Sequence, residues 1–419
     1  MSQVTLGAPP QATSSAVSSI NPMADRLRVA VLLSTSHFEA FYGNDLGLTR
    51  RQYLDGYRND WSWDWCRMLT ETGVDTSLYI ATTLAGEHAA TSDGYRVRFL
   101  PLTSIAAPWT RFTWLERSPV GRYVGQLANT AAMLPALRGA LLEDRIDVLC
   151  VQEYWTARLD VLVRTLSIPV VTVDQGLPDR HEIKMFKRGS FRRTSGVVVQ
   201  TEREAAKVGR YGGQARRIPN AVDIEFFHPD SEELRRLEPV VLCVGRLHNA
   251  QKRLSDVMRA VALLPDTWRL RIAGNGPDRP TLERLSEELG LQGRVEYLGF
   301  VSEGTKLRDL YRSASVVALP SAYEGLPMVL LEAMSCGTPV VGSDIPAIAE
   351  VIERGRTGIL VPVGDPRRLA EALSEAVARR AELGSAARAS IVANYDQAVV
   401  GPRLAQMLRS ARVNSTSSC

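Results

Sequence analysis

The sequence predicts an α/β protein with two Rossmann-like, doubly wound parallel sheets that face each other across a cleft. Two observations predict this architecture. Short apolar runs alternate with amphipathic helical patterns along the chain, which is typical of parallel sheets wrapped by helices. The chain of 419 residues is also long enough for two domains of ordinary size, each with its own core. Open α/β sheets bind ligands beyond the carboxyl ends of their strands, so substrates are expected between the two sheets.

The first domain is assigned to residues 25–219. Its strands are expected at the apolar runs 27–33, 77–81, 97–100, 148–151, 170–173 and 196–199, with helical patterns at 61–72 and 120–142 between some of them. Residues 1–24 are rich in Ser, Ala, Pro and Thr. They have neither the basic start nor the long apolar stretch of a signal peptide, and we expect a disordered tail there.

The second domain is assigned to residues 239–394. Its strands are expected at 240–244, 268–273, 295–298, 316–320, 339–342 and 358–361. The connecting segment 220–238 contains Asn220 and Pro229, which interrupt regular structure and indicate a linker. Helical pattern continues almost to the end of the chain. Residues 395–412 are predicted to form a helix that crosses back to the first domain, and 413–419 a short tail.

Composition argues against several function classes. The formal net charge of +4 is small for 419 residues, so no sequence-wide basic field indicates a nucleic-acid partner. No apolar run approaches the ~18 residues of a membrane-spanning helix. The cysteines are widely spaced and include no CxxC pair, which predicts reduced core residues of a cytoplasmic protein without a metal or redox centre. They are Cys66, Cys150, Cys243, Cys336 and Cys419.

Two glutamates, Glu324 and Glu332, belong to the most informative segment, which lies between the apolar runs 316–320 and 339–341. The pattern indicates a strand, a short Gly/Pro loop, a helix and a second strand. A helix start offers free backbone amides to an anion, whereas carboxylates accept hydrogen bonds from sugar hydroxyls. The segment therefore indicates a nucleotide-sugar site. The alternative is a helix with ordinary solvated acids, which does not explain a glutamate in the most apolar helix of the region.

Two basic residues follow the first strand of the second domain. Gly245 and Arg246 end the run 241–247, and Lys252 comes six residues after Arg246. A guanidinium can bind two phosphate oxygens and an ammonium adds a point charge, so the two side chains together suit a diphosphate. Either residue alone is better explained as a solvated surface charge. Gly274 lies in the turn after the next strand, where glycine is weak evidence because any tight turn uses it.

These motifs resemble the retaining glycosyltransferases of family four, which have the GT-B architecture. The resemblance covers the second domain, from Gly245-Arg246 and Lys252 through Gly274, Gly276, Leu298-Gly299 and Glu324-Gly325 to the stretch from Glu332 to Val341. It implies that Arg246 and Lys252 hold the donor diphosphate, that Glu324 binds the donor sugar and that Glu332 binds the ribose. It also implies that the backbone of Gly325, Leu326 and Pro327 contacts sugar or phosphate, and that Val301 lies by the base.

The first domain departs from that pattern. Family members carry a Gly-Gly-rich turn after the first strand, whereas this chain has a long loop, 34–48, in which Gly43 and Gly47 could still approach phosphate. A loop of this length suggests an unusual acceptor pocket or a lid. Of the three tryptophans at 61, 63 and 65, two are expected in the core.

The acceptor side is less well defined. Relatives place a histidine near Asp174 or Gln175, and His181 is the nearest substitute, although a surface histidine in a charged loop explains it better. Acidic residues cluster near the ends of two predicted strands and suggest a site for a cationic sugar or aminocyclitol. They are Glu153, Asp174, Asp179 and Glu182.

Residues 180–193 alternate basic and apolar side chains. A basic amphipathic helix there would dock on anionic lipid at the inner membrane face, and a solvated basic face is the alternative. Both interpretations stay open at this stage.

The resemblance implies transfer with retention by front-side displacement. No Asp-x-Asp metal motif is present, so neither a metal nor a cofactor is expected, and Arg246, Lys252 and helix-start amides would stabilise the leaving diphosphate. We expect a UDP-sugar rather than a GDP-sugar donor, and a small natural product, an amino sugar, a lipid or a glycan as acceptor. The rival functions are a phosphorylase or epimerase of the same architecture and a catalytically inactive nucleotide-sugar-binding partner protein.

Overall fold

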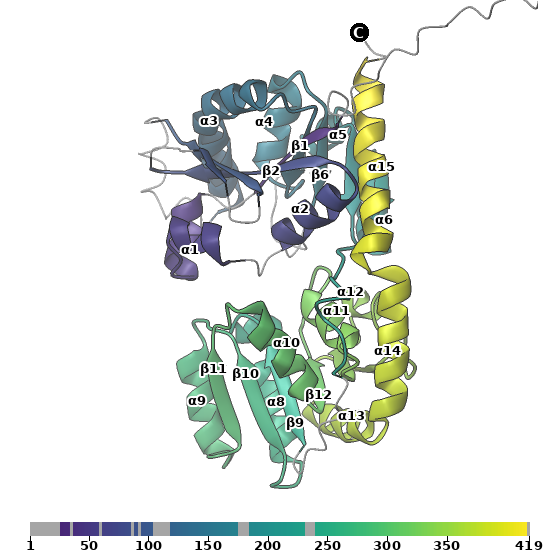
Figure 1. Cartoon of the computed structure of the whole chain (residues 1–419). Coiled ribbons are helices and arrows are strands. Elements are labelled where there is room, and N and C mark those ends of the chain that lie inside the picture. Colours follow the sequence, from purple (N-terminus) through teal and green to yellow (C-terminus); the bar gives the residue numbers. More distant parts are fainter. Residues whose placement is uncertain are drawn as a thin grey trace, which may run out of the picture.

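The computed structural model describes residues 26–33, 37–57, 61–84, 88–90, 94–103, 118–174, 184–230 and 239–416. Two α/β units lie one above the other, each with a sheet and its flanking helices (Figure 1). The long helix α15, Gln397–Thr416, leaves the lower unit and runs alongside the upper one (Figure 1). The predicted fold class is confirmed.

The first sheet has the strand order β3-β4-β2-β1-β5-β6-β7-β8. Its strands are β1 Arg28–Leu32, β2 Asp75–Thr82, β3 His88–Ala90, β4 Arg96–Pro101, β5 Val148–Gln152, β6 Val170–Val173, β7 Gly196–Val199 and β8 Ala215–Arg217. Neighbours pair in parallel, except that β3 pairs antiparallel with β4. The two edge strands β3 and β8 are absent from the sequence prediction because three-residue strands leave no apolar run to detect.

Helices cover both faces of this sheet. They are the π-helix η1 Glu39–Asp45, α1 Arg50–Asp55, α2 Trp61–Glu71, α3 Pro119–Glu143, α4 Ala157–Thr165, α5 Lys187–Phe191 and α6 Glu202–Arg210. One core contains α2 and α15 and the other contains α3 and α4. Residues Val400, Leu404 and Leu408 of α15 are fully buried in the first of these cores, so the last helix completes the first unit.

A glycine allows α15 to approach the first unit closely. A Cβ atom added at Gly401 would lie 2.6 Å from Cγ of Met68 on α2, which is closer than packed atoms tolerate. The helix begins two residues later than the predicted 395 and continues to Thr416, so its end at 412 was predicted too early. Helical pattern in a sequence marks such ends only to within a few residues.

The second sheet has the order β11-β10-β9-β12-β13-β14, and all of its pairs are parallel. Its strands are β9 Val240–Val244, β10 Arg269–Ala273, β11 Val295–Gly299, β12 Val316–Leu319, β13 Val340–Ser343 and β14 Ile359–Val361. Its helices are α7 Asn249–Lys252, α8 Leu254–Ala262, α9 Arg279–Glu288, α10 Gly304–Ser313, α11 Met328–Ser335, α12 Pro346–Ala349, α13 Pro366–Ala378 and α14 Arg380–Asn394. All six predicted strands are present.

The loop after β1 is filled by aromatic rings. Phe38, Tyr42 and Tyr53 are buried, and the ring centroids of Tyr42 and Tyr53 lie 4.6 Å apart. Trp63 and Trp65 are buried against the same core while Trp61 is only partly buried, which confirms the expectation that two of the three tryptophans pack inside. The described part of this loop is thus helical and packed on the core.

Four cysteines lie in the described part of the chain, and all four are buried with free thiols: Cys66, Cys150, Cys243 and Cys336. Among the described helices, none is both long and apolar enough to cross a bilayer.

Candidate functional site

The site is built where β9 and β10 end. Gly245 has φ 143° and donates its N–H to the carbonyl oxygen of Ala273 at 2.9 Å. Gly274 has φ 146°, and a Cβ atom there would lie 1.9 Å from the carbonyl oxygen of Gly245. The two strand-end turns therefore touch through their backbones, and only glycine allows this contact. From the sequence alone Gly274 is only a weak indication, but the fold gives a steric reason for glycine at this position.

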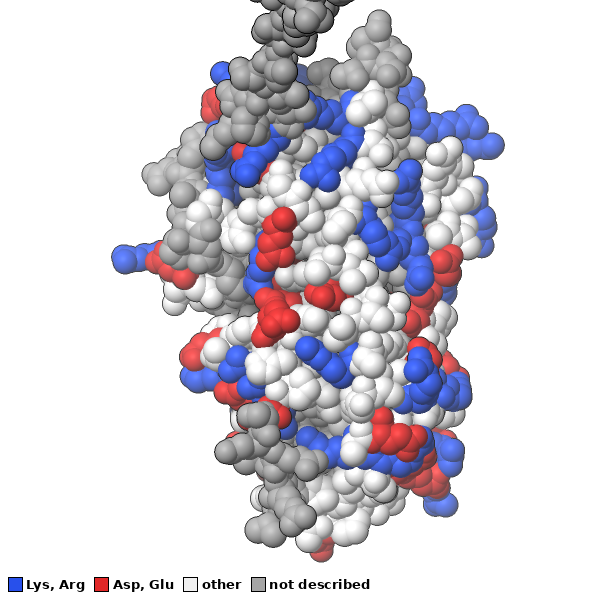
Figure 2. All heavy atoms as spheres, turned by 45° about the vertical axis from the view of Figure 1, so that its right-hand side comes forward, with Lys and Arg blue, Asp and Glu red and all other residues white. Residues whose placement is uncertain are grey.

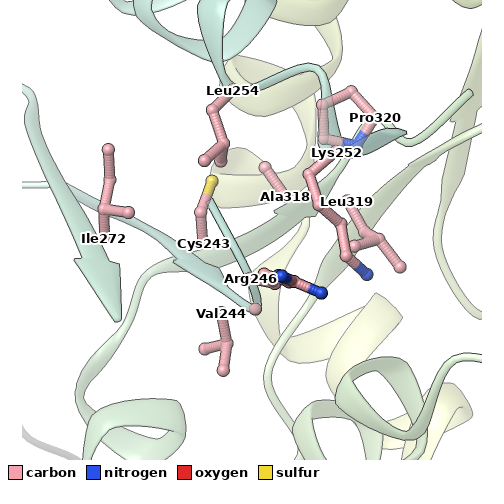
Figure 3. Close-up of a pocket in the computed structure, with 10 residues that line it drawn as sticks. Cys243, Val244, Arg246, Lys252, Leu254, Ile272, Ala318, Leu319 and Pro320 are labelled. Atoms are coloured by element: carbon pink, nitrogen blue, oxygen red, sulfur yellow. The ribbon is translucent and has the colours of Figure 1, made fainter. Parts of the chain in front are cut away.

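Arg246 and Lys252 both line the pocket at this strand end. Figure 3 shows their side chains extending from the β9 end and from α7 with their nitrogen atoms toward the same side. Lys252 is the last residue of the short helix α7, and a Cβ atom at Gly245 would lie 3.2 Å from its Cε. The lysine stem thus passes over the glycine. The structure brings together two basic side chains that the sequence predicted as one group.

Glu324 joins them from the loop between β12 and α11. Lys252 Nζ lies 2.6 Å from Glu324 Oε1, and the two side chains are only 15% and 8% exposed. The loop is tied to α7 by backbone as well, because Ala322 donates its N–H to the carbonyl oxygen of Gln251 at 2.8 Å. The side-chain amide of Gln251 donates to the carbonyl oxygen of Tyr323 at 3.4 Å. These hydrogen bonds therefore fix the loop that carries Glu324 against α7, although the two segments are distant in sequence.

Glu332 on α11 has a different partner. The hydroxyl of Tyr311 on α10 donates to Glu332 Oε2 at 2.6 Å. Burial raises the pKa of Glu332 to about 7, although the Tyr311 hydrogen bond works in the opposite direction. The sequence predicted that this glutamate needs a partner in an apolar helix, but it did not identify Tyr311. That tyrosine follows Leu307 by four positions and has the pattern of an ordinary core residue.

The loop that carries Glu324 also touches the first unit. Leu326 donates its N–H to Oε1 of Gln200 at 3.2 Å, and the Gln200 amide donates from Nε2 to Oδ1 of Asn220 at 2.9 Å. Gln200 and Asn220 are 2% and 3% exposed. Neither was singled out from the sequence as a site residue, since a single glutamine after a strand has no distinguishing pattern.

The acceptor-side candidates lie at the carboxyl ends of β5 and β6. Glu153 has φ 64° and donates its N–H to the carbonyl oxygen of Val173 at 2.7 Å, which places it beside Asp174 at the end of β6. Asp174 is 2% exposed. The structure adds Glu204 to this group, because burial and the charge of Asp174 raise the pKa of Glu204 to about 7. Gln175, Asp179, His181 and Glu182 lie outside the described residues.

A buried arginine balances the acids. Arg158 is 6% exposed and its Nη1 donates to the carbonyl oxygen of Leu33 at 2.6 Å. Burial lowers the pKa of Arg158, and the charge of Glu153 works against that shift. Arg158 of α4 is therefore a buried cation near the acidic residues at these strand ends.

Gly43 belongs to the π-helix η1, and a Cβ atom there would meet nothing closer than Cβ of Glu39 at 3.9 Å. The fold thus gives no steric reason for glycine at this position. The same helix presents a carboxylate instead: Glu39 accepts hydrogen bonds from the hydroxyl of Thr82 at 2.6 Å and from Arg50 at 3.1 Å. Burial works to raise the pKa of Glu39, but these bonds and one from Thr83 lower it to about 2.

The basic segment 180–193 is not one amphipathic helix in its described part. Helix α5 spans only Lys187–Phe191, and both end residues are buried. Lys187 Nζ lies 3.0 Å from Asp160 Oδ2 and donates to the carbonyl oxygen of Thr156 at 2.6 Å. Lys187 and Phe191 are therefore not part of an exposed basic amphipathic face. Met185 and Phe186 remain exposed, at 77% and 45%.

Basic side chains are nonetheless common on the upper unit. In Figure 2 Lys and Arg predominate over that unit on the face that carries α15, whereas both signs are mixed over the lower unit. Exposed arginines of α6, β8 and α15 include Arg210, Arg216, Arg403 and Arg409.

Comparisons with known proteins agree with this geometry. Residues 238–379 match the family described as glycosyl transferases group 1, and residues 62–221 match the glycosyl transferase 4-like domain. The α-D-kanosaminyltransferase of Streptomyces kanamyceticus is 32% identical over 249 residues, which is 54% of this chain and 63% of that protein. A D-inositol 3-phosphate glycosyltransferase of Mycolicibacterium smegmatis is 34% identical over 218 residues, 48% of this chain and 50% of that protein. The chain spans 63% or less of the length of such curated relatives.

Solved structures share the fold. Sucrose-phosphate synthase from Thermosynechococcus elongatus has a TM-score of 0.72 at 21% identity, over 92% of this chain and 98% of that chain. Anabaena HepE, solved in complex with UDP and glucose, has a TM-score of 0.65 at 18% identity, over 92% of this chain and 100% of that chain. Both likenesses support the two-unit architecture that Figure 1 shows.

Proposed function

The chain belongs to the group 1 glycosyltransferases with the GT-B fold, and on that premise we propose that it moves a sugar from a nucleoside diphosphate sugar to an acceptor hydroxyl with retention. One observation carries the proposal: Lys252 Nζ lies 2.6 Å from Glu324 Oε1 beside Arg246, at the carboxyl end of β9. Two cations that suit a diphosphate thus lie together with one carboxylate that suits sugar hydroxyls.

The role of each side chain follows from its chemistry. Arg246 and Lys252 bind the diphosphate, and Glu324 accepts hydrogen bonds from the donor sugar. As the bond between the sugar and the leaving phosphate breaks, negative charge develops on the phosphate, and the two cations stabilise it without a metal ion. The leaving phosphate takes the proton of the attacking hydroxyl as the new bond forms on the same face of the sugar.

Other parts of the donor are assigned to neighbouring groups. Glu332, oriented by Tyr311, accepts from the ribose hydroxyls, and Val301 lies by the base. The backbone of Gly325 and Pro327 contacts the sugar or the phosphate. We favour a UDP-sugar over a GDP-sugar, and the likeness to HepE, solved with UDP and with UDP-glucose, supports this choice.

We further propose an amino sugar or another small natural product as acceptor. Two acidic side chains, Asp174 at the end of β6 and Glu204 in the first turn of α6, and the likeness to a kanosaminyltransferase support it. Asp174→Asn and Glu153→Gln should each raise the acceptor KM and leave the donor KM unchanged. Unchanged acceptor KM values in both variants would refute the acidic acceptor site.

A lipid or glycan acceptor is the second candidate. The exposed side chains of Met185 and Phe186, next to exposed Arg188, favour peripheral contact with an anionic membrane from the cytoplasmic side. The four buried free thiols support a reducing compartment. Flotation with vesicles that contain anionic lipid tests the contact, and protein that stays unbound argues for a free small acceptor.

The experiment for the proposed function is a thermal-shift screen of the purified protein with UDP, GDP, ADP and their glucose and mannose derivatives, followed by transfer assays. A ligand that binds only the native state raises the melting temperature, so the donor should stand out. Product that forms only with an acceptor identifies a transferase. Product without an acceptor indicates an epimerase, phosphate dependence indicates a phosphorylase, and binding without turnover on any acceptor indicates an inactive binding protein.

A further inference from the structure

We propose that Gln200 is a positioning residue: from the first unit, it fixes the donor loop, residues 324–327 of the second unit, and so sets how Glu324 meets the donor sugar. This inference rests on the proposed function of Glu324. The structural basis is the hydrogen bond from the Leu326 N–H to Gln200 Oε1 at 3.2 Å, made between buried groups 126 positions apart.

Gln200 is itself held in place. It follows β7, and its N–H donates to Oε2 of Glu204 at 3.0 Å, while Glu204 donates its N–H to the hydroxyl of Thr201. The Thr201 hydroxyl thus caps α6, and the Glu204 carboxylate holds the backbone of the residue before the cap. The side-chain amide is fixed at its other end as well, because Nε2 donates to Asn220 Oδ1 at 2.9 Å. A side chain fixed at its backbone and at both amide atoms is a rigid support.

Glu324 lies between two anchors of different origin. On its N-terminal side, Ala322 donates its N–H to the carbonyl oxygen of Gln251 at 2.8 Å, within the second unit. On its C-terminal side, Leu326 is held by Gln200 of the first unit. The residue after Leu326 is Pro327, which has no N–H to offer as a replacement. The backbone position of Glu324 therefore depends on both units together.

Gln200 is not required to hold the units together. Two residues further along, the N–H of Glu202 donates to Glu350 Oε1 at 2.9 Å, and Arg217 lies 3.0 Å from Glu350 Oε2. The long helix α15 adds a buried apolar contact. Loss of the Gln200 amide should thus release the donor loop while the two units stay docked.

A change at Gln200 should affect binding of the diphosphate and binding of the sugar to different extents. Arg246 projects from the turn after β9, which is fixed by the backbone bond of Gly245 to Ala273 and not by the donor loop. One of the two cations assigned to the diphosphate, Lys252, contacts the donor loop through Glu324. Diphosphate affinity should therefore fall less than affinity for the sugar part when Gln200 is altered. Affinity for the sugar part, which depends on Glu324, should fall.

The test compares Gln200→Met with Gln397→Met. Both replace a glutamine that is at most 5% exposed with an apolar side chain of similar length, but Gln397 lies at the start of α15 and donates its N–H to the carbonyl oxygen of Val222. Gln200→Glu is the partial rescue variant, since its carboxyl keeps an oxygen that can accept from Leu326 but loses the N–H that Gln200 donates to Asn220. Two readouts are measured: hydrogen exchange of the Leu326 amide in the ligand-free protein, and affinities for UDP and UDP-glucose.

Exchange of the Leu326 amide should be about tenfold faster in Gln200→Met, as expected for loss of one net hydrogen bond. It should stay at the wild-type rate in Gln397→Met and return toward that rate in Gln200→Glu. UDP-glucose affinity should fall about tenfold in Gln200→Met while UDP affinity changes less than about twofold.

Unchanged exchange at Leu326 overturns the inference, and so does an equal loss of UDP and UDP-glucose affinity, which would indicate general loosening. Failure of the proposed function has a different signature. If wild-type protein binds neither compound, the UDP-sugar proposal fails, while the exchange comparison still decides whether Gln200 holds the donor loop.

Discussion

Lys252 Nζ lies 2.6 Å from Glu324 Oε1 although the two residues are 72 positions apart. This contact joins the residue assigned to phosphate with the residue assigned to sugar. Both side chains are largely buried, so removal of one leaves the other as a poorly solvated charge. The two proposed roles are therefore energetically coupled.

The coupling can be measured with Lys252→Met, Glu324→Gln and the double variant. Each single variant should lose stability, and the double variant should lose less than the sum, with an interaction free energy of about 1 kcal/mol or more. Urea unfolding gives the stabilities. Additive losses would mean that the ion pair contributes nothing, and the same set with Glu382→Gln in place of Glu324→Gln is the uncoupled control.

Glu324→Ala should also abolish transfer, by at least about a hundredfold in kcat, because the sugar loses its main acceptor group and Lys252 loses its partner. The measurement is product formation at saturating donor. Normal turnover in this variant would refute the assignment of Glu324.

Arg246→Ala should act on binding rather than on stability. Loss of a guanidinium that contacts two phosphate oxygens is expected to weaken nucleoside diphosphate affinity by roughly tenfold to a hundredfold. Arg271→Ala is the matched control, since Arg271 on β10 pairs with Glu296 outside the pocket. Titration calorimetry with UDP compares the two. Equal affinity in both variants would remove Arg246 from the site.

Gly274→Ala should destabilise the second unit by about 3 kcal/mol or more, because the new Cβ atom would lie 1.9 Å from a backbone oxygen at φ 146°. Gly290→Ala is the control: its φ of 66° is also left-handed, but no atom lies within 4 Å of the added Cβ. That change should cost only about 1 kcal/mol. Unfolding midpoints test the difference, and equal losses would contradict the close approach of the two turns.

Stability should depend on pH through Glu332. Burial raises its folded-state pKa to about 7 from an ordinary value of 4.5, so the folded protein binds more protons than the unfolded chain between these values. The stabilising contribution of the protonated form is complete below about pH 4.5 and is lost as pH rises through 7. Glu332→Gln cannot titrate, so its melting temperature relative to wild type should be higher at pH 8 than at pH 5. A pH-independent difference would show that Glu332 does not titrate in this range.

Local patterns predicted most of the fold because the signal for a buried parallel strand is local. The run 240–244 is apolar throughout and is followed by Gly245, and the run 316–320 is apolar and ends in Pro320. The edge strands β3 and β8 were not predicted because pairing with the neighbouring strands, and not their own residues, makes them strands. The basic segment allowed two interpretations because its periodicity could not show that Lys187 has a buried partner in Asp160.

The sequence by itself determined the two-sheet architecture, the order of the donor-side motifs and the residue types available for chemistry, because these follow from apolar periodicity and from the side chains themselves. Only the tertiary structure decided which of those side chains meet. The contacts of Glu324 with Lys252, of Glu332 with Tyr311 and of Leu326 with Gln200 join positions 72, 21 and 126 residues apart. The reason is physical: such distances are set by how helices and loops pack across two sheets, which no short stretch of sequence specifies.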